Sequence, residues 1–115
     1  MKMATALVND RVRAALDALA ECVEACEACA QNCIGSASAE MAACAKLCLD
    51  CATLCSACVT LLSRDSRFAA DLCRSCADAC DACAAECDKF DDDIMRACAE
   101  ACRRAAEQCR QVAAA

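Results

Sequence analysis

The sequence contains no histidine, proline, tryptophan or tyrosine, and it has one glycine among its 115 residues. The absence of histidine excludes the usual serine and cysteine catalytic triads and any zinc site with imidazole ligands. Without proline, and with one glycine, the chain lacks the turn residues that a many-stranded β fold requires. A net charge of −6 argues against nucleic acid as a partner. The composition therefore predicts a protein that is neither an enzyme nor a nucleic-acid binder.

Cysteine is the residue that the chain has in excess, with 17 copies. The length is typical of one domain, so we expect residues 1–115 to form a single unit. No stretch has the pattern of a signal peptide, and none reaches the roughly 18–20 uncharged residues of a membrane span. We therefore expect a cytoplasmic protein with no membrane partner, in which the thiols stay reduced.

The cysteine pattern also argues against a framework of disulfides. An odd number of cysteines leaves at least one thiol without a partner within a monomer. Side chains three or four residues apart on a helix have Cβ atoms about 5–6 Å apart, whereas a disulfide requires about 3.5–4.5 Å. Reduced cysteine is the better interpretation.

The cysteines fall into four groups in which every step is three, four or seven residues. The groups are Cys22, Cys26, Cys29 and Cys33; Cys44, Cys48, Cys51, Cys55 and Cys58; Cys73, Cys76, Cys80, Cys83 and Cys87; and Cys98, Cys102 and Cys109. Such steps place each group on one face of an α-helix, and alanine, the strongest helix former, fills much of the space between them. Charged residues lie off these faces, so the cysteines are expected to point inward. The sequence predicts an all-α, antiparallel up-down-up-down four-helix bundle with a cysteine-lined core.

Breaks in the pattern give the expected helix boundaries. We expect helices over residues 10–33, 38–62, 66–88 and 92–112. Gly35 suits the C′ position of the first helix and Ser36 the N-cap of the second. Asp65 or Ser66 is expected to cap the third helix, and one of residues 91–93 the fourth.

Aligning the four faces antiparallel predicts successive layers of inward side chains. From one end these are Cys33, Met41, Cys87 and Met95; Cys29, Cys44, Cys83 and Cys98; Cys26, Cys48, Cys80 and Cys102; Cys22, Cys51, Cys76 and Ala105; and Leu19, Cys55, Cys73 and Cys109. The far end is expected to be closed by an apolar plug of Leu16, Leu61, Leu62, Phe68, Leu72 and Val112, with Cys58 at its edge. Phe90 is expected to cover the first end.

Thiolates and thioethers are soft ligands that select Cu(I), zinc or iron–sulfur clusters. Structural zinc and iron–sulfur clusters usually take cysteines from turns and loops, whereas two- or three-coordinate Cu(I) can use thiols spaced along a helix. We therefore expect all 17 cysteines, with Met41 and Met95, to bind multiple Cu(I) ions per chain. That number of ligands exceeds what a chaperone or sensor needs and indicates storage or sequestration. Met41, Met95 and the acidic residues 91–93 are expected to form a mouth that captures Cu(I).

Other interpretations remain open for several of these features. The thiols could serve a zinc or cadmium sink, or they could be small core side chains of a helical interaction bundle. Met41 could be ordinary packing, and residues 91–93 could act as helix caps beside the helix dipole. The second helix also carries more leucine and valine than one core face can bury, including Leu47 and Leu54, which predicts a homo-oligomer.

Four segments of the chain resemble the four-helix-bundle copper storage proteins of bacteria, in particular their cytosolic branch. They are CVEACEACAQNC (22–33), MAACAKLCLDCATLCSACVTLL (41–62), FAADLCRSCADACDACAAEC (68–87) and CAEACRRAAEQCR (98–110). The resemblance implies a homotetramer of bundles filled with Cu(I), which either protects other proteins from copper or supplies copper enzymes. This chain departs from the family pattern in two places. Met95 and Ala105 stand where that pattern has cysteine, and residues 88–93 lack the histidines that it tends to carry there.

Overall fold

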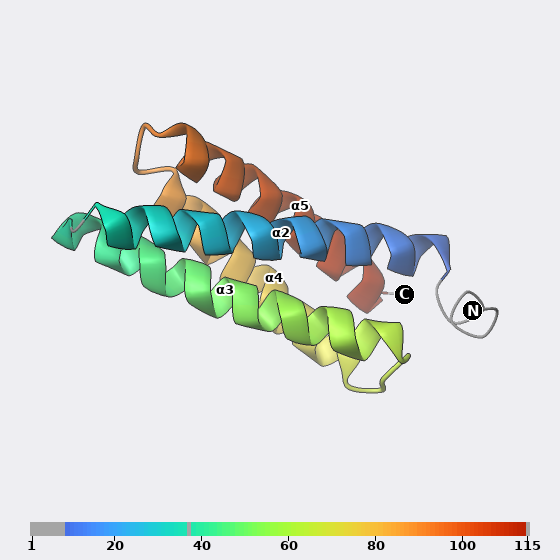
Figure 1. Ribbon diagram of the computed structural model, residues 1–115. Coiled ribbons are helices and arrows are strands. Elements are labelled where there is room, and N and C mark those ends of the chain that lie inside the picture. The colour runs from blue at the N-terminus through green and yellow to red at the C-terminus, as the bar shows by residue number, and fades with distance from the viewer. Residues whose placement is uncertain (1–8, 37, 115) are drawn as a thin grey trace.

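A computed structural model describes residues 9–36 and 38–114 of the chain. The elements in chain order are α2 (Asp10–Gly35), α3 (Ala39–Ser63), α4 (Ala69–Cys87) and α5 (Asp93–Ala114). Each helix packs against two neighbours, in the ring order α2, α3, α4, α5 and back to α2. Figure 1 shows that consecutive helices run in opposite directions along an elongated bundle. The predicted up-down-up-down architecture is confirmed.

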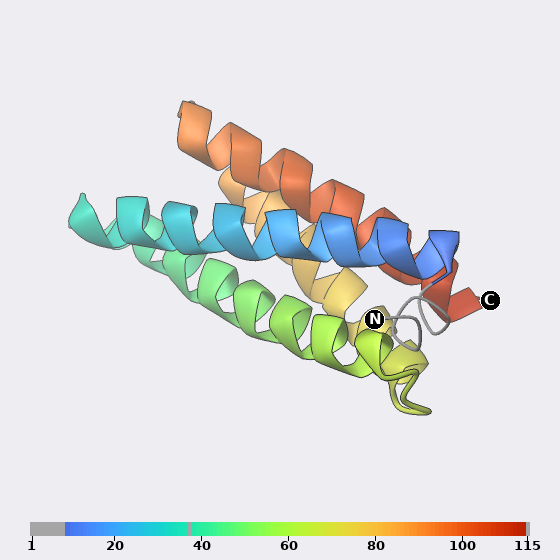
Figure 2. The ribbon, with the colours of Figure 1, turned by 45° about the vertical axis from the view of Figure 1, so that its right-hand side comes forward.

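The two ends of the bundle differ in what they contain. One end holds the α2–α3 and α4–α5 connections, and the other holds the α3–α4 connection, the start of α2 and the end of α5 (Figures 1 and 2). We call the first the open end and the second the closed end. The bundle measures 47 × 25 × 18 Å along its principal axes.

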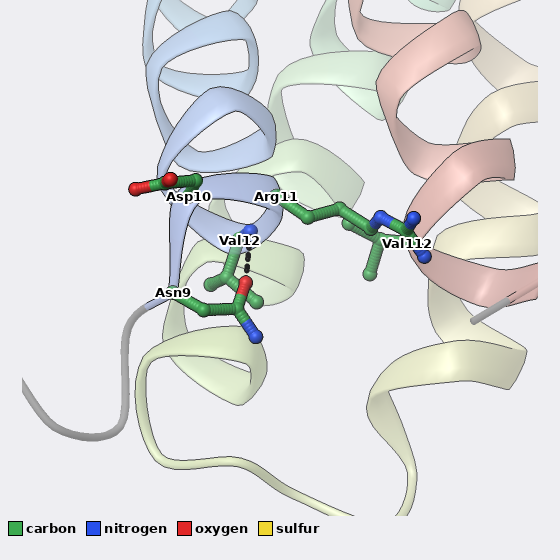
Figure 3. Close-up of a pocket in the computed structure, with 5 residues that line it drawn as sticks. All are labelled: Asn9, Asp10, Arg11, Val12 and Val112. Carbon is green, nitrogen blue, oxygen red and sulfur yellow. Dashed lines mark hydrogen bonds between the residues drawn. The ribbon is translucent and has the colours of Figure 1, made fainter.

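Side-chain caps start two of the helices. At the closed end, the Asn9 side chain accepts a hydrogen bond of 3.0 Å from the backbone N–H of Val12 and begins α2 (Figure 3). At the open end, Asp92 Oδ1 accepts hydrogen bonds from the N–H groups of Ile94, at 2.8 Å, and Met95, at 3.2 Å. The prediction that one of residues 91–93 caps the fourth helix is therefore confirmed.

The predicted caps between α2 and α3 are wrong. Helix α2 continues to Gly35, which has no positive φ, and Ser36 takes the C-cap of α2 by donating its N–H to the Asn32 carbonyl at 3.2 Å. The N-cap of α3 is Ser38, whose side chain makes no capping hydrogen bond. Because α2 continues two residues past Cys33, the residues expected to separate the helices belong to its last turn.

The third helix begins at Ala69 and not at residue 66. Asp65 adopts a left-handed conformation with φ 52°, which turns the chain after α3. Ser66 Oγ then accepts a hydrogen bond of 3.1 Å from the N–H of Phe68, the N-cap residue of α4, so this serine orders the turn that precedes the helix. Neither Asp65 nor Ser66 is the N-cap itself.

The core consists almost entirely of cysteine and alanine. All 17 cysteines are buried, as are Leu16, Leu19, Leu62 and Met95, and no polar side chain is buried among the described residues. The apolar plug is smaller than predicted, because Leu61, Leu72 and Val112 are only partly buried. The core is therefore cysteine-lined, as predicted, with few large aliphatic side chains.

Phe68 does not belong to the plug, whereas Phe90, the predicted cover residue, packs on the core. Phe68 is 59% exposed, because it precedes the first turn of α4, and the Arg67 guanidinium stacks 4.9 Å from its ring centre. Cys58, predicted at the edge of the plug, is fully buried. Phe90 is partly buried against the core at the open end.

Helix α3 is the one described helix long and apolar enough to cross a membrane by length and composition. Its cysteines face the bundle core, and 39% of its most apolar window is buried inside the protein. Core helices of bundles meet the same criteria, so this property alone does not indicate a membrane.

Candidate metal centre

The thiols are grouped by helix pair, and the first group lies between α2 and α5. The Sγ atoms of Cys22, Cys26 and Cys102 form a nearly equilateral triangle with separations of 3.8, 3.7 and 3.7 Å. An ion at its centre would lie about 2.2 Å from each sulfur, close to the ~2.3 Å of a metal–thiolate bond. Cys98 extends this α2–α5 cluster, with its sulfur 3.8 Å from that of Cys26 and 4.0 Å from that of Cys102.

A second group with the same arrangement lies between α3 and α4. Its sulfurs belong to Cys51, Cys55, Cys76 and Cys80, and we call it the α3–α4 cluster. The Cys51, Cys55 and Cys80 sulfurs are separated by 3.9, 3.8 and 3.4 Å. Cys76 Sγ lies 3.5 Å from Cys55 Sγ and 4.0 Å from Cys80 Sγ. The two clusters contact each other through Cys22 and Cys51, whose sulfurs are 3.8 Å apart.

The sulfur path continues from these clusters towards the open end. Cys48 Sγ lies 3.6 Å from Cys83 Sγ and 4.0 Å from Cys98 Sγ. Beyond it, Cys87 Sγ lies 3.5 Å from Cys44 Sγ and 3.9 Å from Cys29 Sγ. The path ends at a trio, Cys29, Cys33 and Cys44, whose sulfurs all lie within 4.8 Å of one another. Cys33 is 2% exposed, whereas every other cysteine is fully buried, so the path comes closest to solvent at this end.

One last group of thiols lies towards the closed end of the bundle. Cys58 has the thiols of Cys109, Cys73 and Cys76 as its neighbours, and hydrogen bonding with them raises its pKa. Leu19 and Ala105 fill the core one turn beyond Cys22 and Cys102 and are themselves fully buried. In the layer of Leu19 and Ala105, α2 and α5 therefore contribute no sulfur. The sulfur path passes this layer through cysteines of α3 and α4.

The predicted layers are correct for α2 against α3 but wrong for α4. Across α3 and α4, the sulfur contacts join Cys44 to Cys87, Cys48 to Cys83, Cys51 to Cys80 and Cys55 to Cys76. The predicted pairs instead placed Cys44 with Cys83 and Met41 with Cys87, one helical turn away. Since α4 begins at Ala69, the centre of the connection between α3 and α4 lies about two residues later in the sequence than expected. This difference shifts every pairing of an α3 cysteine with an α4 cysteine.

Burial keeps the Cys44 thiol protonated in the metal-free protein. Burial, followed by hydrogen bonding with Cys87, raises the pKa of Cys44 from 9.0 to about 12. A soft metal ion that binds such a thiol must displace its proton, because the thiolate is the ligand. Metal uptake by this core therefore releases protons.

The two methionines predicted as ligands lie at the open end in different environments. Met95 is fully buried on the core face of α5, one turn before Cys98. Met41 is partly exposed, and the Ser36 hydroxyl lies 2.9 Å from its Sδ and 2.8 Å from the Cys33 carbonyl oxygen. One hydroxyl proton can be donated to only one of these two acceptors. No feature of the sequence indicated that the Ser36 hydroxyl would contact Met41, because this contact depends on how α2 ends.

The surface hollow at the closed end is not part of this site. Its volume is about 390 Å³, and Asn9, Asp10, Arg11, Val12 and Val112 line it (Figure 3). None of these side chains is a soft ligand. The soft metal ligands of the described chain therefore lie in the buried core and not in this hollow.

Comparison with known proteins identifies close relatives of this core. Residues 8–114 match the family model described as "Copper storage protein". Apo copper storage protein 3 from Bacillus subtilis is 39% identical, with a TM-score of 0.82 over 88% of this chain and 97% of that one. The Cu(I)-bound copper storage protein BsCsp3 is 37% identical, with a TM-score of 0.86 over 90% of this chain and 99% of that one.

A third solved structure is similar along the same length. The Nmul_A1745 protein from Nitrosospira multiformis is 34% identical, with a TM-score of 0.82 over 90% of this chain and 95% of that one. No curated protein sequence matches the chain significantly. The similarity therefore extends over nearly the whole bundle, and one of the similar structures holds Cu(I).

Proposed function

The chain belongs to the copper storage protein family, and from this premise we propose which of its side chains hold the stored metal. It binds Cu(I) through clusters of core cysteines and is not an enzyme. We assign all 17 cysteines as Cu(I) ligands and Met41 and Met95 as auxiliary ligands at the open end. Residues 1–115 act as one storage domain in this proposal.

The close spacing of the sulfurs supports the assignment of the cysteines. Neighbouring sulfurs lie 3.5–3.9 Å apart among Cys29, Cys44 and Cys87, and 3.4–4.0 Å apart from Cys48 through both clusters to Cys76. The two stretches are joined by the sulfurs of Cys29, Cys48, Cys87 and Cys98, which lie within 4.8 Å of one another. Triangles of this size suit three-coordinate Cu(I), and sulfurs shared between triangles can bridge adjacent ions. The thioether of methionine stays neutral and binds more weakly than thiolate, which suits capture and release where the path nears solvent.

Several copies of the chain associate through α3 in this proposal. Leu49 is 44% exposed, and Leu47, Leu54 and Leu61 are only partly buried on the same helix. Ion pairs join α5 to α4 through Arg110 and to α2 through Arg104, but among the described residues none crosses from α3 to a neighbour. An outer face that is rich in leucine and carries few charges, among them Lys46 and Asp50, suits contact with a second copy, and the resemblance to the family implies a tetramer. We also place the store in the cytoplasm, where thiols stay reduced.

The test is an anaerobic titration of the fully reduced protein with Cu(I), counted against a competing chelator. We expect saturation near or above one copper per cysteine, because each ion needs two or three thiolates and sulfurs can bridge. Saturation at one or two ions would contradict storage. A preference for zinc at one ion per four thiols would favour a zinc sink instead.

A further inference from the structure

The segment of residues 88–93, which joins α4 to α5 and includes the first residue of α5, lies directly over soft ligands of the core. It carries four aspartates and one lysine, begins immediately after Cys87 and ends two residues before Met95. Both of these sulfur side chains are fully buried. Cys87 Sγ contacts the sulfurs of Cys29 and Cys44, at 3.9 and 3.5 Å, so the core thiols begin just beneath this connection.

The charged side chains around the open end have a net negative charge when the cations that pair with them are included. We call them the acidic rim, which comprises the carboxylates of Glu40, Glu86, Asp88, Asp91, Asp92 and Asp93 and the cations of Lys89, Arg96 and Arg103, with a net charge of −3. Arg96 pairs with Asp91 and Asp93, whose side chains are 97% and 94% exposed. Arg103 pairs with Asp88, and Lys89 with Glu86 at 2.9 Å. The connection at the closed end, residues 64–68, has a net charge of +1, so the bundle is electrostatically polar along its axis.

Two exposed apolar side chains accompany the acidic rim. Ile34, in the last turn of α2, is 59% exposed, and Ile94, in the first turn of α5, is 44% exposed. The ends of these two helices lie at the same end of the bundle (Figure 2). Apolar side chains among charges of one sign are typical of a protein-binding surface. A bundle end that measures at most 25 × 18 Å suits a small, transient contact and not a permanent one.

We propose that the open end docks a Cu(I)-carrying protein whose metal-binding thiolates lie on a positively charged face, and that the acidic rim disfavours anionic Cu(I) complexes. The inference rests on the proposed function, because it takes the open end as the route to the core. A negative rim attracts a cationic carrier and raises its association rate, and it repels complexes of Cu(I) with small anionic thiols. Transfer is a ligand exchange in which copper stays Cu(I). Core thiols lose protons as they bind it, and the carrier's thiolates are released and can be reprotonated.

Two synthetic donor peptides would test the charge preference. Each contains one Cys-x-x-Cys site loaded with Cu(I), flanked by four lysines in one peptide and by four glutamates in the other. Anaerobic stopped-flow measurements would give the rate of transfer to the reduced protein at low and high ionic strength. We expect the lysine peptide to deliver copper about tenfold faster or more at low salt. The difference should collapse at ~0.5 M salt, where screening acts over a few ångströms.

Matched variants locate the effect on the protein. Neutralising part of the rim with Glu40→Gln, Asp91→Asn and Asp93→Asn should remove most of the preference for the lysine peptide. The control, Asp17→Asn, Asp71→Asn and Asp78→Asn, changes the total charge equally, at exposed acids that also pair with arginines away from the rim. It should keep the preference. Equal rates from both peptides, or equal loss of preference in both variants, would overturn the inference.

The final copper content separates this inference from the proposed function. Normal capacity with no preference between the peptides contradicts only the charge selection at the open end. Low capacity in the unmodified protein, with copper added from a neutral donor, contradicts the storage function on which the inference rests.

Discussion

At the residue scale, the unusual feature is cysteine in the core positions that leucine fills in most bundles. The thiol is small, so the core buries less apolar surface per residue, and among the described residues Leu16, Leu19 and Leu62 are its only buried aliphatic side chains larger than alanine. In return, side chains three or four apart present sulfurs close enough to share an ion. At each of these core positions, a side chain that can bind metal thus replaces one that would only pack.

The methionines give a prediction at this scale. Replacing Met41 and Met95 by leucine should slow Cu(I) loading severalfold and leave the final capacity nearly unchanged, since thioethers assist capture while thiolates hold the store. Leucine conserves volume, so packing around buried Met95 should change little. Anaerobic stopped-flow loading measures the rate, and chelator competition measures the capacity. The single variants separate the exposed from the buried sulfur, and unchanged rates in both would exclude the capture role.

At the scale of the helices, α3 differs from the other three. It contributes five cysteines to the core while keeping leucines on its outer face. Helix α5, by contrast, carries arginines that pair with aspartates of α4, among them Arg110 with Asp81 at 2.7 Å. Ion pairs therefore join α4 to α5, whereas the outer face of α3 carries leucines with few charges, among them Lys46 and Asp50.

A double substitution on α3 tests the proposed contact between copies. Leu47→Glu with Leu54→Glu should convert the protein to smaller species in sedimentation velocity, because two charges cannot be buried without partners in an apolar interface. The control is Ala14→Glu with Ala82→Glu, which adds the same charge at exposed positions of α2 and α4. If the mass of the α3 variant equals that of the unmodified protein, the contact lies elsewhere.

At the scale of the whole molecule, stability depends on the protonation of the buried Cys44 thiol. The pKa of Cys44 is raised from 9.0 to about 12 by burial, so the folded state retains a proton that the unfolded chain loses above pH 9. Stability from this effect is fully present below pH 9 and is lost as pH rises towards 12. Deprotonation of this thiol lowers the free energy of unfolding by about 1.4 kcal/mol per pH unit in that range.

We therefore expect the reduced, metal-free protein to unfold at lower urea concentration at pH 10 than at pH 7.5. The Cu(I)-loaded protein should show little of this loss, because its thiols are already deprotonated and bound. Circular dichroism during anaerobic urea titration would measure both midpoints. Equal midpoints at the two pH values for the metal-free protein would contradict the role of buried, protonated thiols.

The sequence by itself determined that the cysteines face the core, because steps of three, four and seven residues leave a helix no other way to bury them. It also determined the four-helix topology, the capping of α5 by an aspartate and the soft-ligand chemistry. The tertiary structure alone decided which thiols meet. That register depends on the left-handed turn at Asp65 and the late start of α4 at Ala69, and periodicity within a helix carries no information about either. The same turn places Phe68 in solvent, and the last turn of α2 places the Ser36 hydroxyl beside Met41, because loop geometry and not helix pattern sets both positions.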